Sequence, residues 1–493
     1  MRSLLPILLA SALAAQTPDV RELPMEARLS WQTLRMPSPA EPMGLMGLEL
    51  LREHDHGFAW GLGGYGALTG DRGGFITMGL AGAWRPVLTD NLHLDLGAFC
   101  GGGGAGRAFV GGGWMVEGHA GLDWQAETWR LGAAYERIRF PNGDINTGQW
   151  RLSFARPFGL RRSGSPIALA FPDLGWRELE VAFTASRYRP EGGYRTDGTP
   201  ERDVDLVGLQ TALGLGDHAF ATLELAGAHG GGADGYMEGL LGLGWRWGLD
   251  QGDRWRAHFR LAAGPAGGGR LDVGGGFAWK GALGLEARVG ASTVLTAETG
   301  YLAAPGGGYR AITWQVGLGR RFGVAMPGGR PSAPSDTFAD QPWRLEAGLA
   351  ELTDPRRGDA PGGGPVRLAS LRLALPLTPR FYLAGEAAFG TSGRAGGYAE
   401  GLLGVGVESA PLQGPGTSAF AELALGAGGG GGLETRGGAL IQPVLGLHQP
   451  LADGLDLTFR VGRTRALHGG LDSPMVALGL RWRTSVLTRR PRP

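Results

Sequence analysis

The side chains best suited to chemistry are two pairs of glutamates that recur at one spacing. Glu224 and Glu238 are 14 positions apart, and Glu386 and Glu400 repeat that spacing further along the chain. Paired carboxylates can perform acid–base catalysis or bind a cation. A glycine and a threonine stand at the corresponding places of the first third of the chain, so a three-fold catalytic site is not supported. We expect these glutamates to face an enclosed polar interior and to influence the selectivity for ions or solutes.

A second group of polar residues lies on two adjacent alternating segments of the first third. The members that should point inward together are His93, Asp95, Glu117 and His119. A hydrolase site would need a serine beside the histidine and the aspartate, and no serine aligns there. The equivalents of His119 are Lys280 and Gln442, which share only polarity with it. We therefore predict a hydrogen-bonded interior network that includes arginines such as Arg256 and Arg260, and we predict no catalytic residue.

Two short motifs suggest a ligand but lack the context that the ligand needs. His54-Asp55-His56 lies at a predicted turn without the further ligands of a metal site. The segment 61–66 matches G-x-G-x-x-G, but it lies inside a strand pattern, so no helix N-terminus is present to bind a pyrophosphate. The sequence therefore predicts neither a metal site nor a cofactor.

The elements that carry these residues read as β-strands, because apolar and polar or small residues alternate with period two. Examples are 92–97, 255–261 and 455–461, and short turns such as 89–91 join neighbours into antiparallel hairpins. The segments run to about nine to fourteen residues, whereas strands of soluble proteins average about five or six. A tilted strand that crosses a bilayer needs about 9–11 residues. Tryptophans gather near the segment ends, as in the aromatic girdles of membrane barrels.

The chain contains three similar blocks. Residues 235–244 reappear almost unchanged at 397–406, and 74–84 are a more distant copy. The predicted organisation is a signal peptide at 1–15, barrel repeats at 16–158, 177–322 and 343–483, connectors at 159–176 and 323–342, and a basic tail at 484–493. Glycine-rich segments at 101–113, 264–276 and 426–438 occupy equivalent places. We interpret them as flexible surface loops, or as glycines that ease strand curvature.

Composition and the first residues restrict the class of protein. A positive start, an apolar run from Leu4 to Ala15 and an A-x-A site predict an export signal. A single cysteine, Cys100, excludes a disulfide within the chain. The formal net charge of +1 provides no field for nucleic acid. The 93 glycines and 15 tryptophans together do not fit a disordered chain, which would lack aromatic residues.

The export signal, the long alternating strands and the aromatic block ends at Phe158, Phe322 and Trp482 resemble those of bacterial outer-membrane β-barrel proteins. The resemblance covers nearly the whole mature chain and is architectural, without a motif of one family. It implies insertion by the barrel-assembly machinery and contact with outer-membrane lipid. The chain departs from the usual pattern because residues 484–493 follow the last aromatic.

Eight strands per block allow two all-β, antiparallel transmembrane architectures. About 24 strands could close as one wide barrel, or each block could close as a small tandem barrel filled by side chains. The inward residues of 59–65 and 77–83 are mostly glycine and alanine, and a narrow barrel needs bulkier residues. This observation favours one wide barrel, and the long connectors keep three barrels as the alternative.

The leading function is a pore or conduit for small polar solutes in the outer membrane. The first alternative is a structural or adhesion-type barrel with a plugged lumen. An outer-membrane lipase or protease is a further alternative that lacks a nucleophile, so we do not predict an enzyme. Expected partners are outer-membrane lipid, the barrel-assembly machinery during insertion and small solutes.

Overall fold

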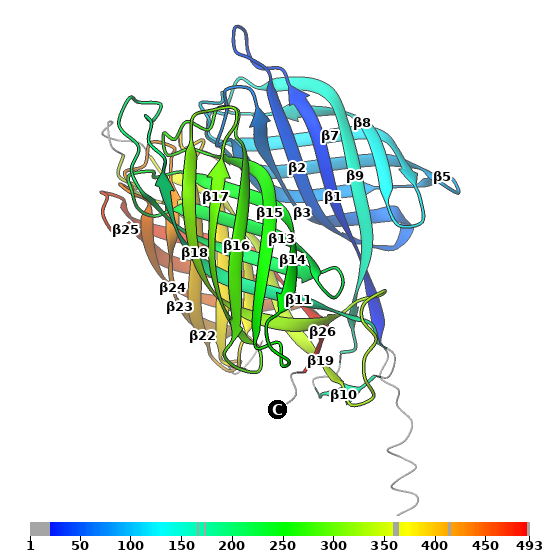
Figure 1. The fold of residues 1–493 in the computed structure, drawn as a ribbon. Coiled ribbons are helices and arrows are strands. Elements are labelled where there is room, and N and C mark those ends of the chain that lie inside the picture. Colours follow the sequence, from blue (N-terminus) through cyan, green and yellow to red (C-terminus); the bar gives the residue numbers. More distant parts are fainter. Residues whose placement is uncertain (1–19, 165–166, 172–173, 358–363, 413–415, 491–493) are drawn as a thin grey trace, which may run out of the picture.

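The computed structural model describes residues 20–164, 167–171, 174–357, 364–412 and 416–490 (Figure 1). The predicted signal peptide at 1–15 lies outside these residues. Within them the regular structure is antiparallel strand, apart from one 3-10 turn at Asp55–Gly57. The alternation predicted from the sequence is therefore confirmed as an all-β fold. No helix in the described part of the chain is long and apolar enough to cross a membrane.

The first part of the chain forms a closed ring of eight long strands. Its strands are β1 (Arg21–Leu34), β2 (Met43–Glu53), β3 (Phe58–Thr69), β4 (Ile76–Trp84), β6 (Leu92–Gly104), β7 (Trp114–Gln125), β8 (Arg130–Arg139) and β9 (Asn146–Arg162). Neighbours in this order pair with each other, β4 pairs with β6, and β1 pairs with β9. A short strand, β5 (Val87–Thr89), pairs only with β6. We call this unit ring 1.

The second part closes in the same way through pairing of its first and last strands, and we call it ring 2. Its strands are β11 (Trp176–Pro190), β12 (Val204–Gly214), β13 (Ala219–Ala228), β14 (Met237–Gly248), β15 (Trp255–Gly267), β16 (Phe277–Arg288), β17 (Thr293–Ala303) and β18 (Arg310–Ala325). Consecutive strands pair, and β11 pairs with β18 from Trp176↔Ala325 to Pro190↔Ala311.

The third part forms ring 3, which is closed by its first and last strands. Its strands are β19 (Thr337–Leu352), β20 (Val366–Pro376), β21 (Phe381–Gly390), β22 (Ala399–Glu408), β23 (Ser418–Gly429), β24 (Ala439–Ala452), β25 (Leu455–Ala466) and β26 (Asp472–Arg489). Consecutive strands pair, and β19 pairs with β26. The short strand β10 (Leu169–Ala170) pairs with the start of β19, and the ends of β18 and β26 also pair.

These pairings show that the prediction of one wide barrel of about 24 strands is wrong, because the first and last strands of each block pair with each other. The strands close in three separate rings, as in the alternative of tandem eight-stranded barrels, and β5 and β10 bring the number of described strands to 26. The inference from the small residues of β3 and β4 failed because long side chains from other strands fill the space beside them. An added Cβ on Gly63 would lie 3.3 Å from Cγ of Glu49 and 3.4 Å from Cδ2 of Phe99.

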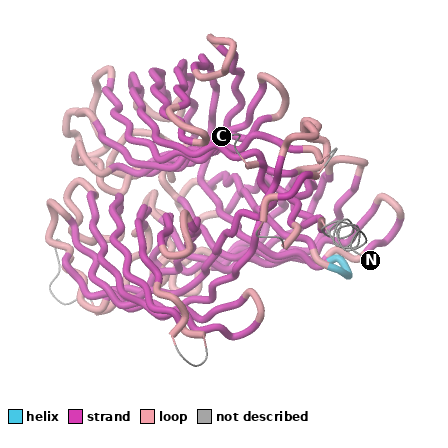
Figure 2. Tube along the Cα trace, turned by 90° about the horizontal axis from the view of Figure 1, so that it is seen from below, coloured by secondary structure: helices cyan, strands magenta, loops and turns pink. Residues whose placement is uncertain are grey.

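Two ends of each ring can be distinguished. The connectors and the end of β26 lie at one end, which we call proximal, and the hairpins β1–β2, β13–β14 and β21–β22 lie at the opposite end, which we call distal (Figure 1). Viewed from below, the rings lie side by side around a shared centre (Figure 2). Even numbers of strands return the chain to the proximal end after each ring, which explains why both connectors lie there.

Glycine-rich distal segments hold the rings together, so the prediction that they are flexible surface loops is wrong. Backbone N–H groups of Gly73 and Gly74 in ring 1 donate to the carbonyl oxygens of Gly274 (2.9 Å) and Ala266 (3.1 Å) in ring 2. An added Cβ on Gly429 of ring 3 would lie 2.4 Å from the nitrogen of Gly235 in ring 2. Side chains would prevent this close approach of backbones.

Ring 1 and ring 3 meet in the same way at their distal ends. An added Cβ on Gly104 would lie 2.8 Å from the nitrogen of Gly397, and one on Gly397 would lie 2.6 Å from the nitrogen of Ala105. Nearer the proximal end, the rings of Trp60 and Trp482 lie 5.2 Å apart between their centroids. Each ring therefore contacts both others.

The proximal boundaries differ from those predicted. β26 continues to Arg489 and pairs with β19 as far as Phe338, so most of the predicted basic tail at 484–493 is strand. β9 extends to Arg162 and β18 to Ala325, beyond the predicted starts of the connectors at 159 and 323. Apolar periodicity ends at Trp482 in the sequence, but backbone pairing does not require an apolar side chain.

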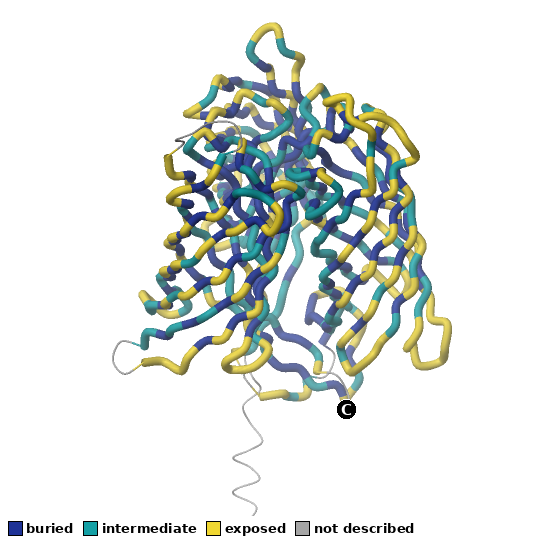
Figure 3. The backbone as a smooth tube through the Cα atoms, turned by 90° about the vertical axis from the view of Figure 1, so that its left-hand side faces the viewer, coloured by how far each residue is buried: buried dark blue, intermediate teal, exposed yellow. Residues whose placement is uncertain are grey.

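Buried and exposed residues alternate along most strands (Figure 3). The outward set is dominated by leucine, valine, phenylalanine and tryptophan, including Trp150, Leu243, Leu283 and Leu445. The inward set carries many charged side chains along the middle and proximal parts of the strands, with Glu238 and Glu400 near the distal ends, and it also contains apolar and aromatic clusters. The distal clusters include Phe75 and Phe140 in ring 1, Tyr236 and Tyr309 in ring 2, and Tyr398 in ring 3. The usual soluble arrangement, apolar inside and polar outside, is thus reversed over the proximal half.

Candidate functional site

The interior of ring 2 brings both glutamates of the first predicted pair into one network. Glu224 on β13 lies 2.6 Å from Nζ of Lys280 and 2.8 Å from Nη1 of Arg260, and its side chain is fully buried. Two inward cations around one carboxylate leave no unpaired charge at this point. Such pairing compensates for the desolvation that an isolated buried charge would suffer.

Glu238 on β14 takes part in the same network through tyrosines. Tyr188 and Tyr236 donate hydrogen bonds to its two carboxylate oxygens at 2.5 and 2.9 Å. Nζ of Lys280 also donates to the hydroxyl of Tyr188 at 2.9 Å. Lys280 and Tyr188 therefore connect Glu224 with Glu238, which is not the shared-proton contact that acid–base catalysis by a carboxylate dyad requires.

The network continues toward the proximal end. Nη2 of Arg260 lies 2.7 Å from Glu298, and Nε2 of His258 lies 2.9 Å from the same carboxylate. Nδ1 of His258 lies 3.4 Å from Glu286, which in turn lies 2.6 Å from Nη2 of Arg321. A continuous path of charged side chains thus runs through the proximal half of ring 2.

Ring 3 repeats this arrangement with different partners. Nη2 of Arg460 donates to Glu386 at 3.0 Å, and Nε of Arg460 lies 3.4 Å from Glu346. Tyr398 donates to Glu400 at 2.7 Å, as Tyr236 does to Glu238. The two glutamates of the second predicted pair therefore lie inward in the same ring, at equivalent places and in separate contacts.

Ring 1 brings together three of the four residues predicted to cluster there. His119 lies 3.3 Å from Asp95 and 2.7 Å from Glu117. His93 is half-buried on the same face of β6, nearer the proximal end, and within the described residues it makes no hydrogen bond with the other three. Arg28 adds ion pairs with Asp95 at 2.9 Å and Asp123 at 2.8 Å.

Arg28 and its counterpart Arg151 are the main interior residues that the sequence reasoning missed. Nη2 of Arg151 lies 2.6 Å from Glu49, and both arginine side chains are 1 % exposed. Their signal was present in the sequence, because each stands at an inward position of an alternating segment. Small residues on the neighbouring strands leave the space that these long side chains occupy.

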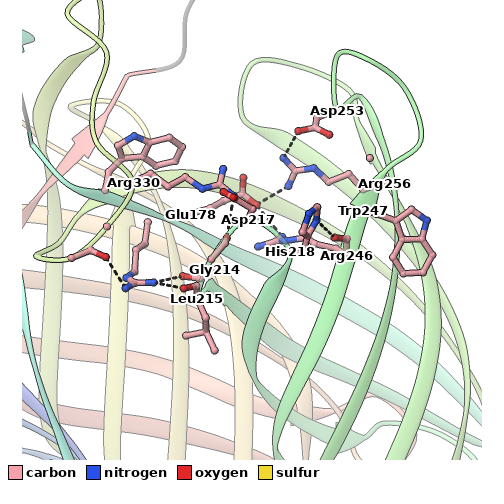
Figure 4. Close-up of a pocket in the computed structure, with 16 residues that line it drawn as sticks. Glu178, Gly214, Leu215, Asp217, His218, Arg246, Trp247, Asp253, Arg256 and Arg330 are labelled. Atoms are coloured by element: carbon pink, nitrogen blue, oxygen red, sulfur yellow. Dashed lines mark hydrogen bonds and ion pairs between the residues drawn. The ribbon is translucent and has the colours of Figure 1, made fainter. Parts of the chain in front are cut away.

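A polar cavity of about 440 Å³ opens at the proximal mouth of ring 2. Figure 4 shows Arg256 between Asp253 and Glu178, with Nη1 of Arg256 donating to Glu178 at 2.8 Å. His218 donates from Nδ1 to the carbonyl oxygen of Arg246 at 3.0 Å. This cavity contains Arg256, a predicted site residue that lies at a mouth and not deep inside a ring.

The connector between rings 2 and 3 covers part of this mouth. Arg330 donates to the carbonyl oxygen of Gly216 at 3.0 Å, and Arg177 donates to that of Gly328 at 2.9 Å. The connector therefore forms one wall of the cavity and narrows access to the interior network.

The distal mouth of ring 2 is covered by the loop 191–203. Both terminal nitrogens of Arg195 in this loop donate to the carbonyl oxygens of Gly231 and Gly232, at 2.6 and 2.5 Å. Thr196 N–H donates to the carbonyl oxygen of Arg270 at 2.9 Å. Burial raises the pKa of Glu201 in the same loop to about 7, so this carboxyl group is only partly ionised near neutrality.

The chemistry available to these sites is charge pairing. Each arginine named above that is buried inside a ring lies against at least one carboxylate, whereas Arg195 in the distal loop donates to backbone carbonyl oxygens. No serine or cysteine nucleophile is paired with a histidine and a carboxylate in the described residues. Within the same residues, no group of three or more histidine, cysteine, aspartate or glutamate side chains has the arrangement of a metal site. Paired and hydrogen-bonded charges of this kind fix a packing arrangement and exclude water.

Neither a protein family nor a curated protein matches the sequence. Among solved structures, the ferric enterobactin receptor PfeA of Pseudomonas aeruginosa is 12 % identical over 93 % of this chain and 81 % of its own, with a TM-score of 0.29. The channel OccK11 (OpdR) of the same organism is 13 % identical over 95 % and 96 %, with a TM-score of 0.23. These proteins are outer-membrane β-barrels. TM-scores this low do not define a shared arrangement of strands, and the closure of the three rings rests on their own pairings.

Proposed function

We propose that the protein is an integral outer-membrane β-barrel protein of a Gram-negative bacterium. Its three rings are sealed to solutes, and it serves as a structural membrane component. The outward face supports the membrane location. Large apolar side chains there are widely exposed, such as Trp150 at 69 %, Leu243 at 64 % and Leu445 at 62 %. Soluble monomers rarely expose contiguous apolar patches beyond a few hundred Å².

The observation that carries the structural role is the filled interior of every ring. Arg28, Arg260 and Arg460 are fully buried at inward positions in rings 1, 2 and 3. The distal half of each ring is packed by aromatic and aliphatic clusters. An eight-stranded barrel is just wide enough for side chains to fill. A solute could therefore cross a ring only after ion pairs and the distal packing separate.

Conductance in planar lipid bilayers tests this proposal. We expect the purified full-length protein to give no stable single-channel steps, because a water-filled path is needed for ions to cross. Incorporation is verified by recovery of the protein with the bilayer lipid in flotation of vesicles. Steady ohmic conductance from verified, folded protein would contradict a sealed structural barrel.

A pore or conduit for small polar solutes remains a second candidate because of one feature of ring 2. The charged network runs from Glu224 to the proximal mouth cavity, so half of a polar path already exists. This candidate predicts conductance whose ion selectivity falls in the double variant Glu238→Gln and Glu400→Gln. The variant Glu351→Gln, at a half-buried carboxylate of β19 that pairs with Arg367, is the control for removal of a charge.

Insertion by the barrel-assembly machinery is part of the same proposal. In outer-membrane barrels the terminal strand carries the recognition signal, and β26 is here the last strand of ring 3. It extends past Trp482 to Arg489 and pairs with β19 along that extension. A protein that remained soluble and monomeric after removal of detergent would contradict the membrane location, and with it the need for this machinery.

A further inference from the structure

The outward face of each ring carries one R-x-R sequence at the distal end of a strand. In ring 1 it is Arg137-Ile138-Arg139 on β8, in ring 2 Arg187-Tyr188-Arg189 on β11, and in ring 3 Arg463-Thr464-Arg465 on β25. The middle residue is buried and both arginines are exposed in every case. All six guanidinium groups thus point away from the ring interiors.

These arginines follow directly on lipid-facing apolar residues of the same strand face. Along β25 the outward residues are Leu457, Phe459 and Val461 before Arg463. β8 and β11 show the same change from apolar residues to arginine, after Tyr135 and Ala185. On these three strands the apolar residues of the outward face end at the arginine pair, and exposed apolar residues on neighbouring strands, Val116 and Ile312, lie opposite Arg139 and Arg189.

The depth of the arginines matches the headgroup layer. Two residues along a strand correspond to about 7 Å, or about 5 Å along the membrane normal at a tilt near 45°. The headgroup region on each side of a bilayer is about 5–8 Å thick. The first arginine of each pair therefore lies at headgroup depth and the second near its outer limit.

Within each pair the side chain of the first arginine is hydrogen-bonded to a neighbouring strand, and that of the second is not, although Arg465 lies opposite Asp472 and interacts with it electrostatically. Arg137 donates to Asn146 at 3.0 Å, Arg187 to Asp205 at 2.7 Å and Arg463 to Asp472 at 2.5 Å. The side chains of Arg139, Arg189 and Arg465 make no hydrogen bond or ion pair within the described structure. Two parallel N–H donors on such a guanidinium match the oxygens of a phosphate.

We propose that Arg139, Arg189 and Arg465 bind the phosphate groups of lipid headgroups in the distal leaflet, one lipid to each ring. The proposal rests on the membrane location proposed above. The partner is a phosphorylated lipid and not free phosphate, because the acyl chains would lie along the apolar residues that precede each arginine pair. The first arginine of each pair orients the site, and the second makes the phosphate contact.

The test is a lipid-binding titration by native mass spectrometry of the full-length protein in detergent, with diphosphoryl lipid A as the probe. The variant carries Arg139→Gln, Arg189→Gln and Arg465→Gln together. The matched control carries Arg107→Gln, Arg202→Gln and Arg394→Gln, which remove three exposed arginines from distal loops of the same rings. Inorganic phosphate, as a competitor, tests whether the acyl chains contribute.

We call the variant with Arg139→Gln, Arg189→Gln and Arg465→Gln the rim variant, and the control with three loop substitutions the loop variant. We expect the rim variant to bind lipid A about tenfold more weakly than wild type and to retain fewer than three lipids. The loop variant should bind lipid A with wild-type affinity. A triple Arg→Lys variant should bind with intermediate affinity, because lysine keeps the charge but loses the two parallel donors. Unchanged binding by the rim variant would overturn the proposal. An equal loss in rim and loop variants would do so too, since it would indicate general charge attraction.

Vesicle flotation distinguishes failure of the proposed membrane location from failure of the proposed headgroup sites. If wild-type protein does not float with phosphatidylcholine vesicles, the membrane location is wrong. If it floats and its lipid A binding does not depend on the rim arginines, only the headgroup sites are wrong.

Discussion

Lys280, the only lysine of the chain, lies with its Nζ 2.6 Å from Oε1 of Glu224, and both side chains are fully buried inside ring 2. Ring 3 has Gln442 at the position of Lys280, and there Arg460 pairs with Glu386. The two rings thus neutralise equivalent glutamates with different cations. Both rings pair the buried glutamate with a buried cation, but they do not use the same residue position for that cation.

The first prediction concerns this pair. Lys280→Met should lower the free energy of unfolding by about 3–5 kcal/mol, because Glu224 would keep only Arg260 as a cationic partner. The double variant Lys280→Met and Glu224→Leu should recover much of that loss, since no uncompensated charge remains. Guanidinium unfolding in detergent, followed by tryptophan fluorescence, measures both. Equal stability of Lys280→Met and wild type would show that the ion pair does not hold ring 2 together.

The second prediction concerns the contact between rings 1 and 2. Gly74→Val should separate the distal ends of the rings, because its Cβ would lie 2.4 Å from the nitrogen of Gly268. Faster amide hydrogen exchange at Gly73 and at residue 74, whose N–H groups bond across the interface, measures this separation. Gly192→Val is the control, since its φ is also positive but no atom lies within 4 Å of the added Cβ. Equal effects of both variants would mean that backbone strain, and not ring contact, is responsible.

Most of the fold could be predicted from the sequence because strand alternation is a local property. The strand class, the antiparallel hairpins and the inward placement of residues such as Glu224 and Glu400 follow from period two alone. Ring closure depends on which distant strands pair, as in β1 with β9, and no local pattern states it. The expectation that a narrow barrel could not be filled counted only the small inward residues. It left out the two long inward arginines of ring 1, Arg28 and Arg151, which occupy much of the interior.

The site was predictable in part for the same reason. Inward residues on adjacent strands could be grouped, so Asp95, Glu117 and His119 were placed together correctly. Their exact partners depend on side-chain reach across the ring. Arg28 on β1 reaches across the interior of ring 1 to Asp95 on β6 and Asp123 on β7. Alternation along single strands does not show which inward residues meet in this way. The glycine-rich segments could not be interpreted without the other rings, since their contacts are with neighbours far along the chain.

The third prediction concerns the end of β26. Deletion of the chain after Arg483 should destabilise ring 3, because β19 would lose its backbone partners from Phe338 to Trp343. Unpaired strand edges of this kind also favour association between molecules. Heat-modifiability in gel electrophoresis and size-exclusion chromatography in detergent measure folding and aggregation. A truncated protein with wild-type mobility and size would indicate that this extension behaves as the tail that the sequence suggests.

The fourth prediction uses the loop 191–203 over the distal mouth of ring 2. Burial raises the pKa of Glu201 from an ordinary value near 4.5 to about 7, so the folded loop binds a proton more tightly than the unfolded loop. The resulting stabilisation is complete below about pH 4.5 and is lost as the pH rises through about 7. Amide exchange in the loop, corrected for the intrinsic rate, should therefore be better protected at pH 5 than at pH 8.

Glu201→Gln should remove this pH dependence and keep the loop protected at pH 8, because the amide cannot ionise. Asp197→Asn is the control, since an exposed carboxylate held by Thr199 in the same loop has a lowered pKa and stays ionised over this range. Loss of protection between pH 5 and 8 that persists in Glu201→Gln would assign the change to another group. Protection that is independent of pH in wild type would show that Glu201 does not control closure of the distal mouth.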